Sequence, residues 1–183
     1  MKPYAAYAIG AALVDTEIQV TDAELAAMNV EKGMMALVDQ ARQRYMLTTL
    51  SDHLIRANHA SGGSAGNSMI ATAMMGAPTY MSCKVAQDAD GDIYLADLEQ
   101  SGVAHGLTER STDGVTGKCI VLITPDAERS LNTHLGISET LSTDEVDEAA
   151  IKGSEWVYLE GYLVTSPSGH AAALKTKALA EAH

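Results

Sequence analysis

The stretch Gly62-Gly63-Ser64-Ala65-Gly66-Asn67 joins a glycine-dense turn to an apolar helix pattern at 68–75. Glycine lacks a Cβ, so a ligand can approach the main chain there. The first N–H groups of the following helix have no intrahelical partners and can bind a polar molecule. Two kinds of site fit this hexapeptide: a clamp for sugar hydroxyls that ends in Asn67, and a Gly-x-Ser-x-Gly nucleophile elbow centred on Ser64.

The composition indicates one globular domain that binds neither nucleic acid nor membranes. The chain has 183 residues, of which 46% are hydrophobic and 20% charged, and its net charge is −12. Nucleic-acid binding requires clustered Lys and Arg, and no basic stripe is present. No apolar run approaches the roughly 18 residues that a membrane span needs.

Two cysteines, Cys83 and Cys119, stand outside any Cys-x-x-Cys pair, so we expect neither a disulfide framework nor a structural zinc site. The histidines are scattered without metal-ligand spacing, and we expect no bound metal. The N-terminus lacks the pattern of a secretion signal. These features predict a cytoplasmic protein.

Strands and helices alternate along the chain, judged from apolar periodicity and from cap and turn residues. In the first part we expect strands at 4–13, 14–20, 34–38 and 79–85. We expect a short helix that begins at residue 21, a helix at 39–47, a helix directly after the glycine turn and a helix at 90–102. In the second part we expect a β-hairpin at 117–135, helices at 142–153 and 166–183, and a buried strand at 156–164.

This order predicts an α/β fold with a mainly parallel sheet flanked by helices, whose ligands bind at the carboxyl ends of the strands. Half-exposed strands at about 13–20 and 115–136 would form a small β flap within a single domain, 1–183. The last helix ends without a capping glycine or a returning strand. We therefore interpret the chain as the N-terminal part of a larger fold, with an exposed sheet edge that a second copy could cover in a homodimer.

Asp15 lies where the chain enters the flap, and its carboxylate could accept hydrogen bonds from two adjacent hydroxyls of a sugar. A solvated turn residue is the alternative interpretation. Asn67 offers both a donor and an acceptor beside the glycine turn, although it could equally satisfy backbone groups at the start of the helix.

A serine hydrolase would need Ser64 together with Asp126 and either His134 or His170. A nucleophile elbow follows a strongly apolar strand, whereas the polar stretch 56–61 precedes this turn, so the hydrolase is disfavoured.

A calcium loop is suggested by the spacing of four acidic residues, but Ile93 stands where such a loop requires glycine. We interpret this segment as the N-terminus of a helix. The four residues are Asp88, Asp90, Asp92 and Glu99.

Taken together, several segments resemble the ribokinase-like carbohydrate and nucleoside kinases, the PfkB family, and most of all its adenosine kinase branch. The resemblance covers essentially the whole chain. It is carried by Gly10 and Asp15, 62–68, Lys84-Val85, Asp88, Gly91, 97–103, 117–122, 124–131 and 158–162.

The resemblance implies a ribokinase-like fold, with the flap as a β lid, and transfer of the γ-phosphoryl group of ATP, with Mg²⁺, to a hydroxyl of a sugar or nucleoside. It implies that Asp15, Gly63 and Asn67 hold substrate hydroxyls, with Gly62 and Ser64 in the same turn. Leu131, Thr133 and Leu135 would line the lid side of the pocket. Arg129 would approach the transferring phosphate, whose charge a guanidinium can stabilise.

The family's Asp-Thr-x-Gly-Ala-Gly-Asp motif, which supplies the anion hole and the catalytic base, has no counterpart here. The nearest string, 113–117, has different glycine spacing and leads into a strand. We therefore expect this chain to carry the substrate-binding half and the lid. A non-catalytic sugar-binding, nucleoside-binding or assembly module is the alternative.

Overall fold

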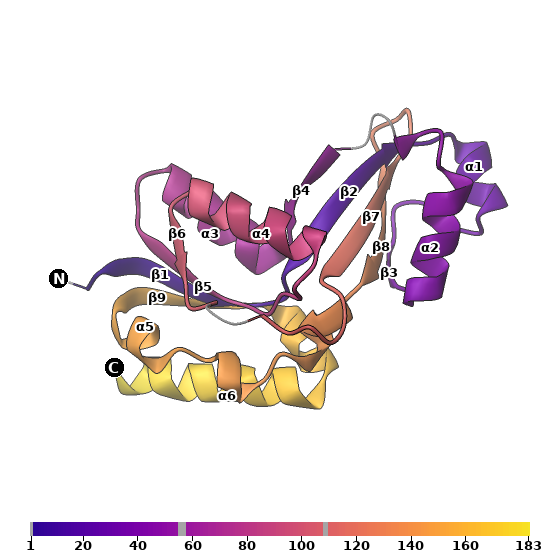
Figure 1. Ribbon diagram of the computed structural model, residues 1–183. Helices are drawn as coiled ribbons and strands as arrows, with labels where there is room; N and C mark the ends of the chain where they lie inside the picture. The colour runs from indigo at the N-terminus through magenta and orange to yellow at the C-terminus, as the bar shows by residue number, and fades with distance from the viewer. Residues whose placement is uncertain (1, 55–57, 108–109) are drawn as a thin grey trace.

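The computed structural model describes residues 2–54, 58–107 and 110–183, which form two sheets (Figure 1). The first sheet has the strand order β6-β5-β1-β9, and all of its strands are parallel. They are short, largely apolar runs, and helices return the chain between them, as parallel pairing requires. The strands are β1 (Tyr4–Ile9), β5 (Thr79–Ser82), β6 (Val103–His105) and β9 (Ser154–Leu159).

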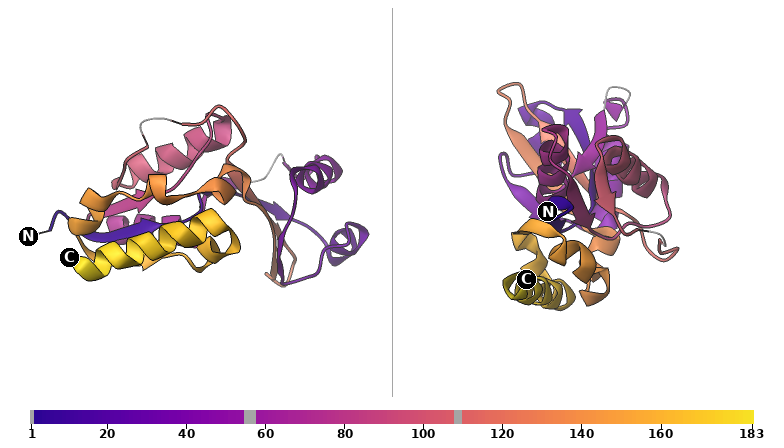
Figure 2. Two further views of the ribbon diagram at one scale, coloured as in Figure 1. Left: turned by 90° about the horizontal axis from the view of Figure 1, so that it is seen from below. Right: turned by 90° about the vertical axis from the view of Figure 1, so that its left-hand side faces the viewer.

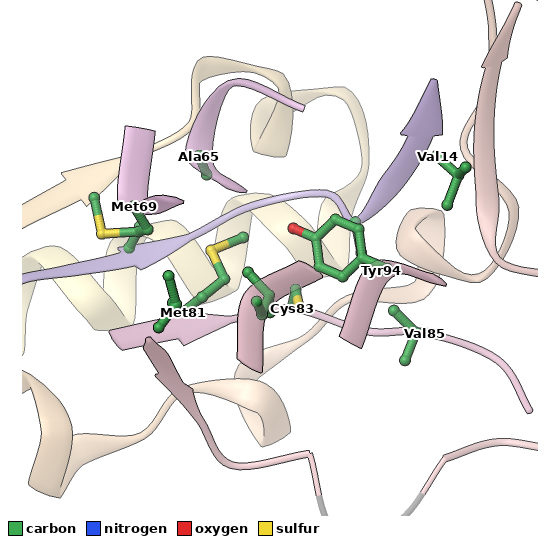
Figure 3. Packing of buried hydrophobic residues seen from close by; sticks show 11 residues of the cluster. Val14, Ala65, Met69, Met81, Cys83, Val85 and Tyr94 are labelled. Carbon is green, nitrogen blue, oxygen red and sulfur yellow. The ribbon is translucent and has the colours of Figure 1, made fainter. Parts of the chain in front are cut away.

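Helices cover both faces of the first sheet. On one face α3 (Ser64–Met74) and α4 (Ala89–Gln100) pack against it, and on the other lie α5 (Glu148–Lys152) and α6 (Pro167–Ala182) (Figure 1). Successive residues of β1 point to opposite faces, so Ala8 joins one core cluster while Tyr7 and Ile9 join the other. In the first cluster Met69, Met81, Cys83 and Tyr94 converge between the sheet and the helices (Figure 3).

The second sheet has the order β3-β8-β7-β2-β4, and in the described part of the chain helices cover only one of its faces. On the covered face, Ile18, Ile120 and Leu122 point towards α1 (Asp22–Ala27) and α2 (Gln40–Thr49). These two helices lie on the side of the second sheet that faces away from the first sheet (Figure 2). The strands are β2 (Leu13–Gln19), β3 (Met35–Leu37), β4 (Asn58–Gly62), β7 (Gly117–Ile123) and β8 (Arg129–His134).

Local signals in the sequence account for several of these boundaries. The predicted capping box is present, with Thr21 and Glu24 bonded to each other's backbone, and Asp39 caps α2. The predicted hairpin is confirmed by the antiparallel pairing of β7 with β8. The expected change from a buried strand to a half-exposed one occurs at Leu13, where the chain has crossed from the first sheet into the second.

Two predicted elements in the second half are wrong. The helix expected at 142–153 is a 3₁₀ turn, Thr143–Glu145, followed by an extended Val146 that interrupts the helical path, and α5 then begins at Glu148. The strand expected at 156–164 ends at Leu159, and a 3₁₀ turn, Gly161–Thr165, follows. That strand is also less buried than expected, because β9 is an edge strand and its Trp156 is 75% exposed.

Strands β4 and β6 were not expected from the sequence. β6 has only three residues, too few for a periodic pattern. β4 is made from the polar stretch before the glycine turn, of which residues 56–57 lie outside the described part of the chain. Across the described residues, no helix has the length and apolar character needed to cross a membrane.

Candidate functional site

A cavity of about 300 Å³ lies between the carboxyl ends of β1 and β9 and the open face of the second sheet. Ligands of open α/β sheets bind at such carboxyl ends. The cavity brings together eight of the nine residues predicted from the sequence, all except Gly62. Its lining comprises Ala11, Leu13, Asp15, Met35, Leu37, Gly63, Ser64, Asn67, Cys119, Arg129, Leu131, Thr133, Leu135, Glu160 and Tyr162.

The second sheet supplies one wall of this cavity. Asp15 on β2 pairs in register with Cys119 on β7, and Cys119 pairs with Thr133 on β8. Paired residues point to the same face, so these side chains stand side by side along the wall. Met35 on β3 extends the wall from its position opposite Leu131.

The glycine turn supplies the opposite wall. Gly63 is the N-cap of α3 and has φ +86°, in the left-handed region that favours glycine. A Cβ there would also lie 2.7 Å from the carbonyl oxygen of Ala11. Ser64 and Asn67 are three residues apart on α3, so they share the helix face that borders the cavity.

Gly62 does not line the cavity. It pairs with Leu13 at the end of β4, and a Cβ on it would collide with the Asp15 carboxylate. Its contribution is therefore to leave room for Asp15.

The Asp15 carboxylate lines the cavity and is partly buried. Burial raises its pKa to about 6, against the opposing effect of the Arg129 charge, and the charge of Glu17 raises it further. Within the described residues this carboxylate takes part in no side-chain hydrogen bond or ion pair. It can therefore accept hydrogen bonds from the hydroxyls of a bound ligand.

Arg129 stands at the rim of the cavity. Its Nη2 lies 2.9 Å from Oε1 of Glu17, and its side chain is about half exposed. Exposed ion pairs of this kind are weak, at about 0–1 kcal/mol. The guanidinium can therefore exchange Glu17 for another anion, such as a phosphate, at little cost.

Glu160 is a buried acidic residue of the cavity to which the sequence analysis assigned no role. Its carboxylate accepts hydrogen bonds from the backbone N–H of Ala11 and from both the N–H and the hydroxyl of Ser64. The sequence analysis placed Glu160 inside the strand expected at 156–164, whereas in the structure it directly follows β9, at the carboxyl edge of the sheet.

The residues of a serine hydrolase are not assembled. The hydroxyl of Ser64 donates to Glu160 at 2.7 Å, and Asp126 is engaged by Lys32 at 2.8 Å. His134 lines a different hollow, and His170 is exposed on α6.

The acidic segment after β5 forms the start of a helix, as predicted. Asp88 is the N-cap of α4, Asp90 pairs with Lys118, and Asp92 pairs with Arg110.

A larger cavity of about 520 Å³, lined in part by acidic residues of 144–148, contains none of the predicted site residues. In the described ranges no three His, Cys, Asp or Glu side chains come together as metal ligands.

A parallel α/β sheet with a second sheet across its carboxyl edge defines the ribokinase-like class of folds, and solved structures of that class superpose on nearly the whole chain. The model of the pfkB family carbohydrate kinases matches residues 33–183, and the chain belongs to this family.

Two solved structures show the extent of the likeness. A probable sugar kinase from Rhizobium etli CFN 42 is 30% identical with a TM-score of 0.91, and 100% of this chain aligns with 54% of that one. The adenosine kinase from Sinorhizobium meliloti is 32% identical with a TM-score of 0.90, over 98% of this chain and 54% of that one. Mouse ribokinase is 25% identical over 89 residues, which are 49% of this chain and 28% of that protein. The chain thus spans about half the length of the two solved kinases.

Proposed function

We propose that this chain carries the acceptor-binding half and the lid of a kinase that phosphorylates a hydroxyl of a nucleoside or sugar with ATP. The observation that carries this proposal is the Asp15 carboxylate, half-buried in the cavity with no described donor to pair with it. Burial without a partner costs free energy, and a ligand with adjacent hydroxyls would recover that cost. The family membership of the chain supports the same reaction.

We further propose that the acceptor is a nucleoside rather than a bare sugar. Apart from Asp15 and Arg129, the side chains that the second sheet points into the cavity are mostly apolar, with Met35, Leu37 and Leu131 among them. A sugar alone would leave these side chains in contact with water, whereas a flat heteroaromatic base would cover them. The likeness to an adenosine kinase of 32% identity supports this choice.

In this proposal Asp15 and Asn67 bind the ribose hydroxyls, and the N–H groups of the glycine turn approach the same ring. Arg129 leaves Glu17 to meet the transferring phosphate. Mg²⁺ in such enzymes is held by one or two carboxylates together with the phosphates of the nucleotide, and we assign no described residue to that ion or to ATP. The two cysteines are free and buried, which suits the reducing cytoplasm that we propose as the compartment.

Calorimetric titration of the purified chain tests the proposal, with adenosine, ribose and fructose as the probes, each with and without Mg²⁺-ATP. We expect adenosine to bind most tightly. Asp15→Asn should weaken adenosine binding by about 1–3 kcal/mol, the usual cost of losing a charged hydrogen-bond partner.

Asp113→Asn is the matched control, because it removes the same charge from an exposed turn outside the cavity. Equal adenosine affinity in Asp15→Asn and the control would remove Asp15 from the site. The alternative is a module that binds nucleosides without transferring phosphate. Adenosine binding with no AMP formed from ATP would support that alternative.

A further inference from the structure

The Glu160 carboxylate ties together three segments that are distant in sequence. Its Oε2 accepts from the N–H of Ala11 at 2.6 Å, at the crossing from β1 to β2. Its Oε1 accepts from the hydroxyl of Ser64 at 2.7 Å and from the N–H of Ser64 at 3.2 Å, at the start of α3. Glu160 itself follows β9 and is only 3% exposed. One buried side chain therefore fixes the crossing, the glycine turn and the end of β9 relative to one another.

The start of α3 depends on this contact. Its N-cap, Gly63, has no side chain, and no side-chain cap hydrogen bond is formed there. The first turn of a helix has unsatisfied N–H groups and a partial positive charge, which a carboxylate satisfies. Glu160 supplies the acceptor for the N–H of Ser64, although it lies 96 residues further along the chain. A Ser or Asp at the N-cap would supply such an acceptor locally.

The backbone also leaves room for this carboxylate. A Cβ at Gly10 would lie 2.7 Å from Oε2 of Glu160 and 2.6 Å from the Cβ of Ala65. Any side chain at position 10 would therefore displace either the carboxylate or the first turn of α3. Glycine at this position allows the three segments to approach one another.

We infer that Glu160 is a positioning residue, which acts through Ser64 and Ala11 to hold the glycine turn in the conformation that forms the wall of the cavity. Three of the roughly four acceptor positions of its carboxylate are already used by the protein. Its contribution to nucleoside binding is therefore indirect. This inference rests on the proposed function for its link to binding, and on the hydrogen bonds alone for its effect on the turn.

Glu160→Gln tests the inference, because the amide keeps the shape of the side chain and replaces one accepting oxygen by a donor. Either Ala11 or Ser64 then faces an NH₂ group. We expect the amides of 63–67 to exchange hydrogen at least about tenfold faster in the ligand-free chain. Adenosine affinity should fall about tenfold or more. Glu155→Gln is the matched control, an exposed glutamate on β9, the strand that Glu160 follows, and should change neither quantity.

A double-mutant cycle with Ser64→Ala separates an indirect role from a direct contact. If Glu160 acts through Ser64, Ser64→Ala weakens adenosine binding in the parent chain but has a much smaller effect in Glu160→Gln. Weakened binding with unchanged exchange of the turn amides would mean that Glu160 contacts the ligand, and would overturn the inference. Unchanged exchange and affinity would also overturn it. If Glu160→Gln does not fold, hydrogen exchange at 63–67 in Ser64→Ala decides: faster exchange supports the inference, and unchanged exchange overturns it. If adenosine does not bind the parent chain, the proposed function fails, and the exchange rates still decide the role of Glu160.

Discussion

The two sheets of this chain are packed differently. Helices cover both faces of the first sheet, where Leu98 of α4 and Met81 of β5 are completely buried. Helices cover only one face of the second sheet, and on its open face Met35 is 38% and Leu37 is 53% exposed. We interpret this difference as a division of roles, in which the first sheet supplies stability and the open face of the second sheet would receive the proposed ligand.

The largest expected effect compares one leucine from each region. Leu98→Ala should lower the free energy of unfolding by about 2–5 kcal/mol, because it leaves a cavity in a closely packed core. Leu37→Ala should change it by less than about 0.5 kcal/mol, because the side chain is half exposed. Urea denaturation of the two variants measures both values.

Adenosine titration of the same pair sharpens the comparison. Leu37→Ala should weaken binding although it hardly affects folding, since Leu37 lines the cavity. Similar losses of stability in the two variants would contradict the division of roles.

A smaller effect is expected from Asp15→Asn, which should raise the free energy of unfolding where Leu98→Ala lowers it. The pKa of its carboxyl is about 6 in the folded chain, above its usual value of 3.8. Between about pH 4 and pH 6 the folded state thus holds a proton that the unfolded state has lost, and stability falls as the pH rises through this window. Asp15→Asn removes this loss and should raise stability by about 1–2 kcal/mol at pH 8, allowing for the partial exposure of the carboxylate to water.

Thermal unfolding of Asp15→Asn from pH 4 to pH 8 measures this change, with Asp113→Asn as the control. The advantage of the variant over the parent chain should be smallest at pH 4 and level off above pH 6. A constant difference across this range would assign the effect to packing rather than to ionisation. A variant that gains stability while losing affinity for adenosine would indicate a residue retained for binding.

The sequence predicted most of the fold because its strongest signals are local. The glycine turn, the caps of α1 and α2 and the alternation of residues 131, 133 and 135 each depend on neighbours only a few residues away. The eight predicted residues that line the cavity were named mainly by the resemblance to the PfkB family, which these local signals supported only at Asp15, Ser64 and Asn67.

Contacts between distant segments could not be predicted in this way. Met35 reaches the cavity only because β3 pairs with β8, nearly a hundred residues away. Glu160 acquires its role from Ala11 and Ser64, which lie 149 and 96 residues away in the sequence. The polar strand β4 is likewise ordered by its pairing with β2 rather than by its own composition.

The smallest effect we predict concerns the covered face of the second sheet. Thr21 and Glu24 form the capping box of α1, and this helix places Leu25 and Met28 in the core behind the sheet. Thr21→Ala should lower stability by about 1 kcal/mol, the usual value of a lost N-cap. Hydrogen exchange should accelerate in α1, while adenosine affinity stays unchanged because α1 does not border the cavity. Thr112→Ala, at an exposed bend outside the helices, is the control. A loss of affinity in Thr21→Ala would show that the covered and open faces of the second sheet are coupled, and the division of roles would then apply to whole sheets rather than to single faces.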